Sequence, residues 1–251
     1  MIQHIVQSPC FMIPTNLDAA IIDLDGTMVD TMGDFVVAIN LMLRDLGLGA
    51  VDREVVALRV GKGSENLVNS VLNHALAQLK PAQAAIINEA DAAHALGLYQ
   101  QHYRAINGKY AHVYPGVVDG LQALQNAGLK LACLTNKPVG FARELLKLKG
   151  LDGFFSQVFG GDSFAAKKPD PLPVLETCEA LGTLPAQTMM VGDSINDAQA
   201  ARAAGCPVLL MTYGYNHGEP IRSVDYADGY LDSLADINLQ SIMMAYPATH
   251  L

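Results

Sequence analysis

The chain has 251 residues, 51% of them hydrophobic and 16% charged, which is enough apolar material for a substantial core and excludes a disordered chain. The formal net charge of −9, with no basic run to offset it, excludes nucleic acid as an expected partner, because an acidic surface repels phosphate backbones. No apolar run reaches the ~20 residues of a membrane-spanning helix, and the first twenty residues lack a basic start, so neither a membrane partner nor a signal peptide is expected.

The first predicted element is a buried strand over residues 19–24, because the run AAIIDL is short and apolar and is followed by the turn residues Asp25 and Gly26. The strand signal then disappears between residues 31 and 112. Helices are predicted there at residues 34–46, 53–59, 65–79 and 82–105. We interpret this stretch as a helical insert that follows the first strand.

Strands and helices alternate after the insert. Strands are predicted at residues 130–134, 157–159, 188–191 and 207–211, and helices at residues 117–127, 139–149, 172–181 and 197–204. This alternation predicts an α/β fold, with a Rossmann-like parallel sheet that carries helices on both faces. The predicted division is a core of residues 1–30 and 113–251 and an all-helical insert of residues 31–112.

Two carboxylates stand directly after the first predicted strand, in the run Asp23-Leu24-Asp25-Gly26-Thr27. Side chains two positions apart in extended backbone point to the same side, and ligands of open parallel sheets bind beyond the carboxyl ends of the strands. One carboxylate is suited to nucleophilic attack and the other to proton transfer. An ordinary Asp-Gly turn remains the alternative.

Other polar residues follow the later strands. Thr135 and Asn136 come after the second predicted strand, where the Thr135 hydroxyl is able to donate to a phosphoryl oxygen. Lys168 precedes a helix start in the run KKPDP, where it would neutralise both a nucleophile and a phosphate. The alternatives are a polar turn for Thr135 and a solvated surface lysine for Lys168.

The run GDSIND comes directly after the fourth predicted strand. Its Asp193 would sit at the strand end, where a carboxylate is a suitable ligand for a hard cation. Ser194 and Asp197 also form the S-x-x-D pattern of a helix cap, so Asp197 has both a structural and a functional interpretation.

The four runs DLDGT, LTN, KKPDP and GDSIND resemble the haloacid dehalogenase superfamily of phosphohydrolases. The longer runs VYPGVVDGL, LTNKP, VGDSINDAQAARAAG and TYGYNHGE are similar to its phosphoglycolate phosphatase branch. The resemblance covers nearly everything except the leader and the last residues. It implies a phosphatase whose partner is a small phosphorylated metabolite and whose helical insert is a cap over the active site.

The resemblance implies a role for each motif residue. Asp23 attacks phosphorus and forms an aspartyl-phosphate, and Asp25 protonates the leaving oxygen and then activates water. Mg²⁺ is held by the Asp23 carboxylate, the Asp25 backbone carbonyl and Asp193. The implied phosphoryl ligands are Thr135, Asn136 and Lys168, and the residue supporting them from behind is Asp197.

The polar loop from Arg59 to Ser64 (RVGKGS) is the part of the cap expected to face the core. Arg59 or Lys62 is a candidate for reading a substrate carboxylate, although a solvated loop between helices fits equally well. The G-x-x-x-x-G-K-[ST] spacing of a nucleotide-binding loop is absent.

The leading hypothesis is hydrolysis of 2-phosphoglycolate. Alternatives with the same chemistry are cleavage of pyrophosphate, another sugar phosphate or a nucleotide, and a phosphomutase. Dehalogenase and phosphonate hydrolase activity are disfavoured by the presence of Asp25. A non-catalytic binding protein is disfavoured because every expected catalytic position is filled.

The four cysteines form no C-x-x-C pair, which favours a cytoplasmic location. The sequence does not decide whether the protein is a monomer or a homodimer.

Overall fold

A computed structural model of the chain describes residues 16–79 and 89–237. Its centre is a six-stranded parallel sheet of order β5-β4-β1-β6-β7-β8. The strands are β1 (Ala19–Ile22), β4 (Lys130–Leu134), β5 (Gln157–Phe159), β6 (Thr188–Gly192), β7 (Val208–Met211) and β8 (Gly229–Leu231). The strands β1, β4 and β6 therefore lie side by side, and the residues that follow them meet at one sheet edge.

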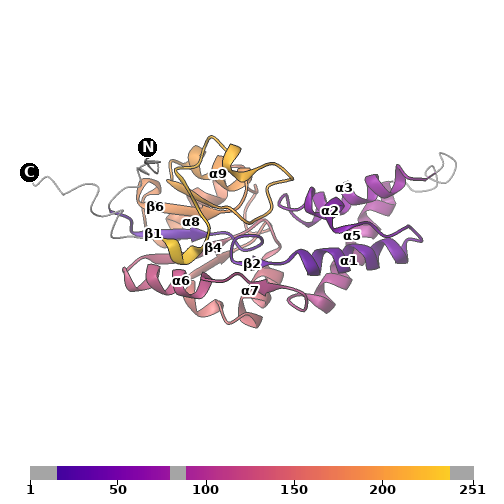
Figure 1. Cartoon of the computed structure of the whole chain (residues 1–251), viewed down its shortest axis with the longest axis horizontal. Helices are drawn as coiled ribbons and strands as arrows, with labels where there is room; N and C mark the ends of the chain where they lie inside the picture. The colour runs from indigo at the N-terminus through magenta and orange to yellow at the C-terminus, as the bar shows by residue number, and fades with distance from the viewer. Residues whose placement is uncertain (1–15, 80–88, 238–251) are drawn as a thin grey trace, which may run out of the picture.

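Helices cover both faces of this sheet, as its strand sequences require. In β1, Ala20 and Ile22 face one core while Ala19 and Ile21 face the other. The first core is completed by α6 (Val117–Asn126) and α7 (Val139–Leu148), and the second by α8 (Leu172–Leu181) and α9 (Ile195–Ala204) (Figure 1). Because both faces are buried, the strands are apolar throughout instead of alternating.

A group of helices lies beyond one end of the sheet (Figure 1). In the sequence, these helices come between the two strands of a small antiparallel ribbon. The ribbon strands are β2 (Val29–Asp30) and β3 (His112–Val113), and the helices are α1 (Met32–Asp45), α2 (Arg53–Ala57), α3 (Ser64–Leu76) and α5 (Glu89–Ile106). These helices share an apolar cluster of their own, in which Tyr99 and Tyr103 are fully buried.

The predicted fold class is confirmed, and the expected strands and helices appear within a few residues of their predicted bounds. The sequence interpretation missed β2, β3 and β8, because strands of two or three residues carry no periodic signal. The start of the helix predicted at residues 82–105 and the N-terminal leader lie outside the described residues. No helix of the described part of the chain has both the length and the apolar character needed to cross a membrane.

Candidate active site

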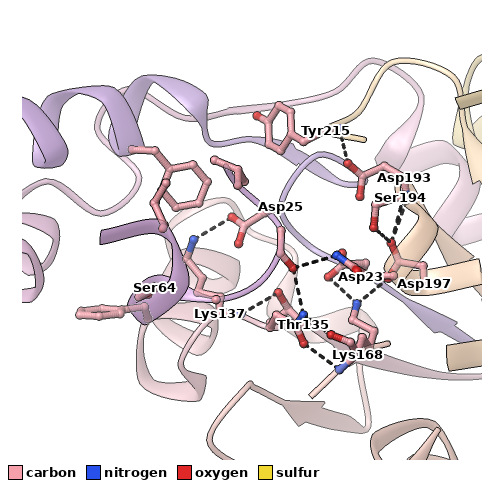
Figure 2. Close-up of a pocket in the computed structure, with 18 of the residues that line it drawn as sticks. Asp23, Asp25, Ser64, Thr135, Lys137, Lys168, Asp193, Ser194, Asp197 and Tyr215 are labelled. Atoms are coloured by element: carbon pink, nitrogen blue, oxygen red, sulfur yellow. Dashed lines mark hydrogen bonds and ion pairs between the residues drawn. The ribbon is translucent and has the colours of Figure 1, made fainter. Parts of the chain in front are cut away.

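A cavity lies where the carboxyl ends of the central strands meet the inserted helices. Seven of the residues predicted to carry chemistry line it together: Asp23, Asp25, Thr135, Asn136, Lys168, Asp193 and Asp197. All of them except Asn136 are labelled in Figure 2. Asp23 follows β1, Thr135 follows β4 and Asp193 follows β6. The sheet topology thus brings together groups that are more than 160 residues apart in sequence.

Asp23 is held in place by two donors on one of its oxygens. Its Oδ1 accepts a hydrogen bond from the Leu24 N–H at 2.7 Å and lies 3.1 Å from Lys168 Nζ. The other oxygen, Oδ2, has no hydrogen-bond partner among residues 16–79 and 89–237. Burial raises the pKa of Asp23 to about 7, although Lys168 opposes the shift. An oriented carboxylate with one free oxygen is suited to attack an electrophile.

Lys168 is a buried cation with three partners. Its Nζ lies 2.7 Å from Asp197 Oδ1, 3.1 Å from Asp23 Oδ1 and 2.8 Å from the Leu134 carbonyl oxygen. Burial alone would lower the pKa of Lys168, but the carboxylates of Asp197 and Asp23 raise it above its ordinary value. The ammonium group therefore stays charged, and the expectation of a solvated surface lysine is excluded by its 3% exposure.

Asp197 serves its helix and the cavity at the same time. Its Oδ2 accepts hydrogen bonds from Ser194 Oγ at 2.7 Å and Ser194 N at 3.1 Å, which caps the start of α9. Its Oδ1 accepts from Lys168. Asp197 therefore caps α9 and holds the Lys168 ammonium group at the same time.

The residues around Asp193 fit a divalent cation. Ligand atoms of Asp23, Asp193 and Asp197 all lie within 4.8 Å of one another, and burial raises the pKa of Asp193 well above its ordinary value, with Asp197 and Asp23 adding to the shift. Three buried carboxylates this close repel each other, and hard cations prefer such oxygen ligands. Both oxygens of Asp197 are engaged by Lys168 and Ser194, and those of Asp193 accept hydrogen bonds from Thr27 Oγ1 and the Tyr215 N–H. Within the described residues, Asp23 Oδ2 is therefore the oxygen of this cluster that has no partner.

Two glycines let the neighbouring loops approach Asp193 closely. A Cβ at Gly26 would lie 2.1 Å from Asp193 Oδ2, and a Cβ at Gly214 would lie 2.2 Å from the same atom. Gly26 also has φ +84°, a backbone conformation that other residues rarely adopt. The backbone cradle around this carboxylate therefore depends on glycine at both positions.

Thr135 and Asn136 follow β4 and have different surroundings. Thr135 lines the cavity, is 3% exposed and accepts a hydrogen bond from the Lys137 N–H. Asn136 hydrogen-bonds to both the N–H and the carbonyl of Lys168, and it also donates to the Gly61 carbonyl at 2.9 Å. Asn136 therefore positions Lys168 and contacts the inserted helices.

The structure adds Lys137, which the sequence interpretation did not single out. Its Nζ donates to Asp25 Oδ1 at 2.7 Å and lies 4.7 Å and 4.8 Å from the ring centres of Phe35 and Tyr103 (Figure 2). Its side chain is 2% exposed. The sequence did contain a signal for this residue, because Lys137 directly follows Thr135 and Asn136. The prediction placed those two residues at the end of a strand but did not extend to Lys137.

The structure does not bring Arg59 or Lys62 into the cavity. The Arg59 guanidinium donates to the Val55 carbonyl at 2.6 Å and to the Ser70 carbonyl at 3.3 Å, both within the inserted helices. Lys62 is exposed and is not among the residues that line the cavity. Of the RVGKGS loop, the cavity wall includes Val60, Gly61, Gly63 and Ser64.

Comparisons with known proteins agree with this geometry. A family model described as haloacid dehalogenase-like hydrolase matches residues 17–205. A phosphoglycolate phosphatase of Thiobacillus denitrificans is 41% identical over 227 residues, which cover 90% of this chain and 96% of the relative. A plasmid-encoded phosphoglycolate phosphatase of Cupriavidus necator is 45% identical over 217 residues, with 86% and 89% covered.

A solved structure has the same fold as this chain. The crystal structure of a predicted phosphoglycolate phosphatase from Haemophilus somnus superposes with a TM-score of 0.83 at 33% identity and covers 88% of this chain and 96% of its own. The family model spans most of the chain, and the relatives match it at about 40% identity, so the chain belongs to the haloacid dehalogenase-like hydrolases.

Proposed function

We propose that this protein is a divalent-cation-dependent phosphatase that hydrolyses 2-phosphoglycolate to glycolate and phosphate through an aspartyl-phosphate. The observation that carries the proposal is the cavity that Asp23 lines together with Lys168, Asp25 and Asp193. One oxygen of the Asp23 carboxylate contacts Lys168, and the other has no partner among the described residues. The relatives named as phosphoglycolate phosphatases support the choice of substrate, because they match nearly the whole chain.

In the first step, Asp23 Oδ2 attacks phosphorus. A new oxygen–phosphorus bond forms while the bond from phosphorus to the ester oxygen breaks, and Asp25 gives its proton to the departing oxygen. Lys168 and the Thr135 hydroxyl stabilise the charge on the transferred phosphoryl group. The 3.1 Å contact between Lys168 and Asp23 Oδ1 supports this step, because it would hold the carboxylate in one orientation during the attack.

In the second step, Asp25 removes a proton from water, and the water oxygen attacks the phosphorus of the aspartyl-phosphate. The bond to Asp23 breaks, and phosphate and a free carboxylate result. One residue that donates a proton first and accepts one afterwards returns to its starting state, so each turnover closes without another acid or base.

A divalent cation, which we take to be Mg²⁺, would supply positive charge that lets an anionic nucleophile approach an anionic phosphate. We propose that it is held by the carboxylates of Asp23 and Asp193 and the backbone carbonyl of Asp25. The buried carboxylate cluster supports this assignment, since it needs positive charge to balance its mutual repulsion.

We also propose that residues 31–112 act as a cap that closes the cavity. In support, the Gly61 carbonyl of the insert accepts hydrogen bonds from two core side chains, Asn136 at 2.9 Å and Asn196 at 3.3 Å. Such closure would exclude bulk water from the first step.

The described cysteines Cys133, Cys178 and Cys206 are free thiols, which supports a reducing, cytoplasmic location.

The test is a panel of phosphate esters assayed with Mg²⁺ and with a chelator. The panel holds 2-phosphoglycolate, pyrophosphate, a hexose phosphate and a nucleotide. We expect the highest kcat/KM for 2-phosphoglycolate, loss of activity with chelator, and a loss of at least about a thousandfold in Asp23→Asn. Asp119→Asn, an exposed position on α6, is the matched control. Activity that survives Asp23→Asn would disprove the mechanism, and faster cleavage of pyrophosphate would disprove the substrate.

A further inference from the structure

Lys137 is a second positively charged side chain in the cavity, in addition to Lys168. Lys168 is engaged by Asp23 and Asp197, whereas Lys137 is paired with Asp25, the proposed proton donor to the leaving group. Lys137 therefore stands on the leaving-group side of the cavity. The proposed function does not assign a task to it.

The Lys137 ammonium group is held firmly but is not saturated. Its Nζ lies 4.7 Å and 4.8 Å from the ring centres of Phe35 and Tyr103, and its side chain is 2% exposed. A lysine ammonium carries three N–H donors, yet within the described residues Nζ donates only to Asp25 Oδ1. Two donors of a buried cation are thus available to a ligand.

An unpaired hydroxyl belongs to one of the two aromatic residues that contact this cation. Tyr103 is 1% exposed and lines the cavity, and its Oη has no hydrogen-bond partner among residues 16–79 and 89–237. Burial raises the pKa of Tyr103 well above its ordinary value, so the hydroxyl keeps its proton and is a donor. A buried donor without a partner is costly, which indicates that the bound state supplies an acceptor.

We propose that Lys137 and Tyr103 form a carboxylate-binding subsite that makes the enzyme selective for phosphate esters whose leaving group is a small 2-hydroxy acid. This inference rests on the proposed function and assigns its specificity. In such an ester the carboxylate begins one carbon beyond the oxygen that Asp25 protonates. Because Lys137 Nζ lies 2.7 Å from Asp25, an anion at that place meets the free donors of Lys137.

The wall behind Lys137 limits the leaving group further. The rings of Phe35 and Tyr103 contact Lys137, and the cavity lining also includes the apolar or aromatic side chains of Leu67, Tyr99 and Phe141. These residues offer few partners for the hydroxyl groups of a sugar. Charge near the ester oxygen is therefore favoured, and a bulky polyhydroxylated leaving group is not.

The test compares kcat/KM for 2-phosphoglycolate with kcat/KM for ethyl phosphate, which lacks the carboxylate, at saturating Mg²⁺. We expect the wild-type ratio to favour 2-phosphoglycolate and to fall about 10- to 100-fold in Lys137→Met, since a hydrogen-bonded charge is removed. Lys147→Met, an exposed position on α7, should leave the ratio unchanged. A role confined to positioning Asp25 would lower both rates equally and leave the ratio unchanged, which would overturn the inference.

A second variant separates recognition from damage to the proton donor. Tyr103→Phe keeps the ring over Lys137 and leaves the Asp25 contact intact, and we expect it to lower the same ratio about 3- to 10-fold. An unchanged ratio in Lys137→Met overturns the inference, and an unchanged ratio in Tyr103→Phe overturns the part assigned to Tyr103. A collapse of the ratio in Lys62→Met alone overturns the inference as well. A wild type that cleaves both esters equally well would instead refute the proposed substrate, while the phosphatase activity would stand.

Discussion

Replacing Lys168 by methionine should destabilise the folded protein strongly, because this residue is the positive centre of a buried cluster. Its Nζ lies 2.7 Å from Asp197 Oδ1 and 3.1 Å from Asp23 Oδ1, and the side chains of Lys168 and Asp197 are 2% and 1% exposed. Removing one partner of a buried ion pair typically costs about 3–5 kcal/mol, since the remaining charge is left uncompensated. We therefore expect the free energy of unfolding to fall by about that amount.

The expected loss depends on pH in a defined direction. The pKa of Asp23 is raised to about 7 in the folded state from its ordinary value of 3.8. Between these values the folded protein binds more protons than the unfolded chain, so stability falls as the pH rises toward 7. Without the opposing charge of Lys168, the folded pKa of Asp23 should rise further, so this loss should extend to higher pH. The Lys168→Met variant should thus be closer to wild type at pH 6 than at pH 8.

The assay is urea unfolding followed by circular dichroism, with a chelator present. The control Lys147→Met should stay within about 0.5 kcal/mol of wild type. The double variant Lys168→Met with Asp197→Asn removes both charges and keeps an oxygen acceptor for Ser194, so it should recover about 1–2 kcal/mol relative to Lys168→Met alone. If the two substitutions are additive within about 0.5 kcal/mol, the electrostatic account of this cluster is wrong.

Other expected outcomes concern the cation site and the contact with the insert. Protons compete with Mg²⁺ for Asp23, whose pKa is raised to about 7, so the increase in melting temperature caused by Mg²⁺ should be larger at pH 8 than at pH 5.5 and should be lost in Asp193→Asn. Gly214→Ala should weaken activation by Mg²⁺ at least about tenfold, whereas Gly140→Ala, where a Cβ has open space, should not; equal effects would contradict the steric argument. Asn196→Ala removes a hydrogen bond to the insert and should raise KM more than it lowers kcat in steady-state assays; an unchanged KM would argue against a contact that closes the cavity.

The sequence by itself determined the fold class and most of the side chains that meet at the ends of the strands. Continuous apolar runs such as KLACL, bounded by helical periodicity, are physically compatible only with a sheet buried on both faces. Because the carboxyl ends of parallel strands share one edge, it also followed that Asp23, Thr135 and Asp193 would lie near one another. The capping pattern of Ser194 and Asp197 was readable for the same reason, since it is local in sequence.

Only the tertiary structure decided which side chains complete the cavity. Arg59 was a reasonable candidate for an anion-binding group, but the carbonyls of Val55 and Ser70 satisfy its guanidinium inside the insert. Lys137 is buried in the cavity wall because the rings of Phe35 on α1 and Tyr103 on α5 pack against it. Both residues are more than thirty positions away from Lys137 in the sequence. Local patterns determine strands, helices and caps through the backbone, whereas the burial and partners of a long charged side chain depend on packing between segments distant in sequence.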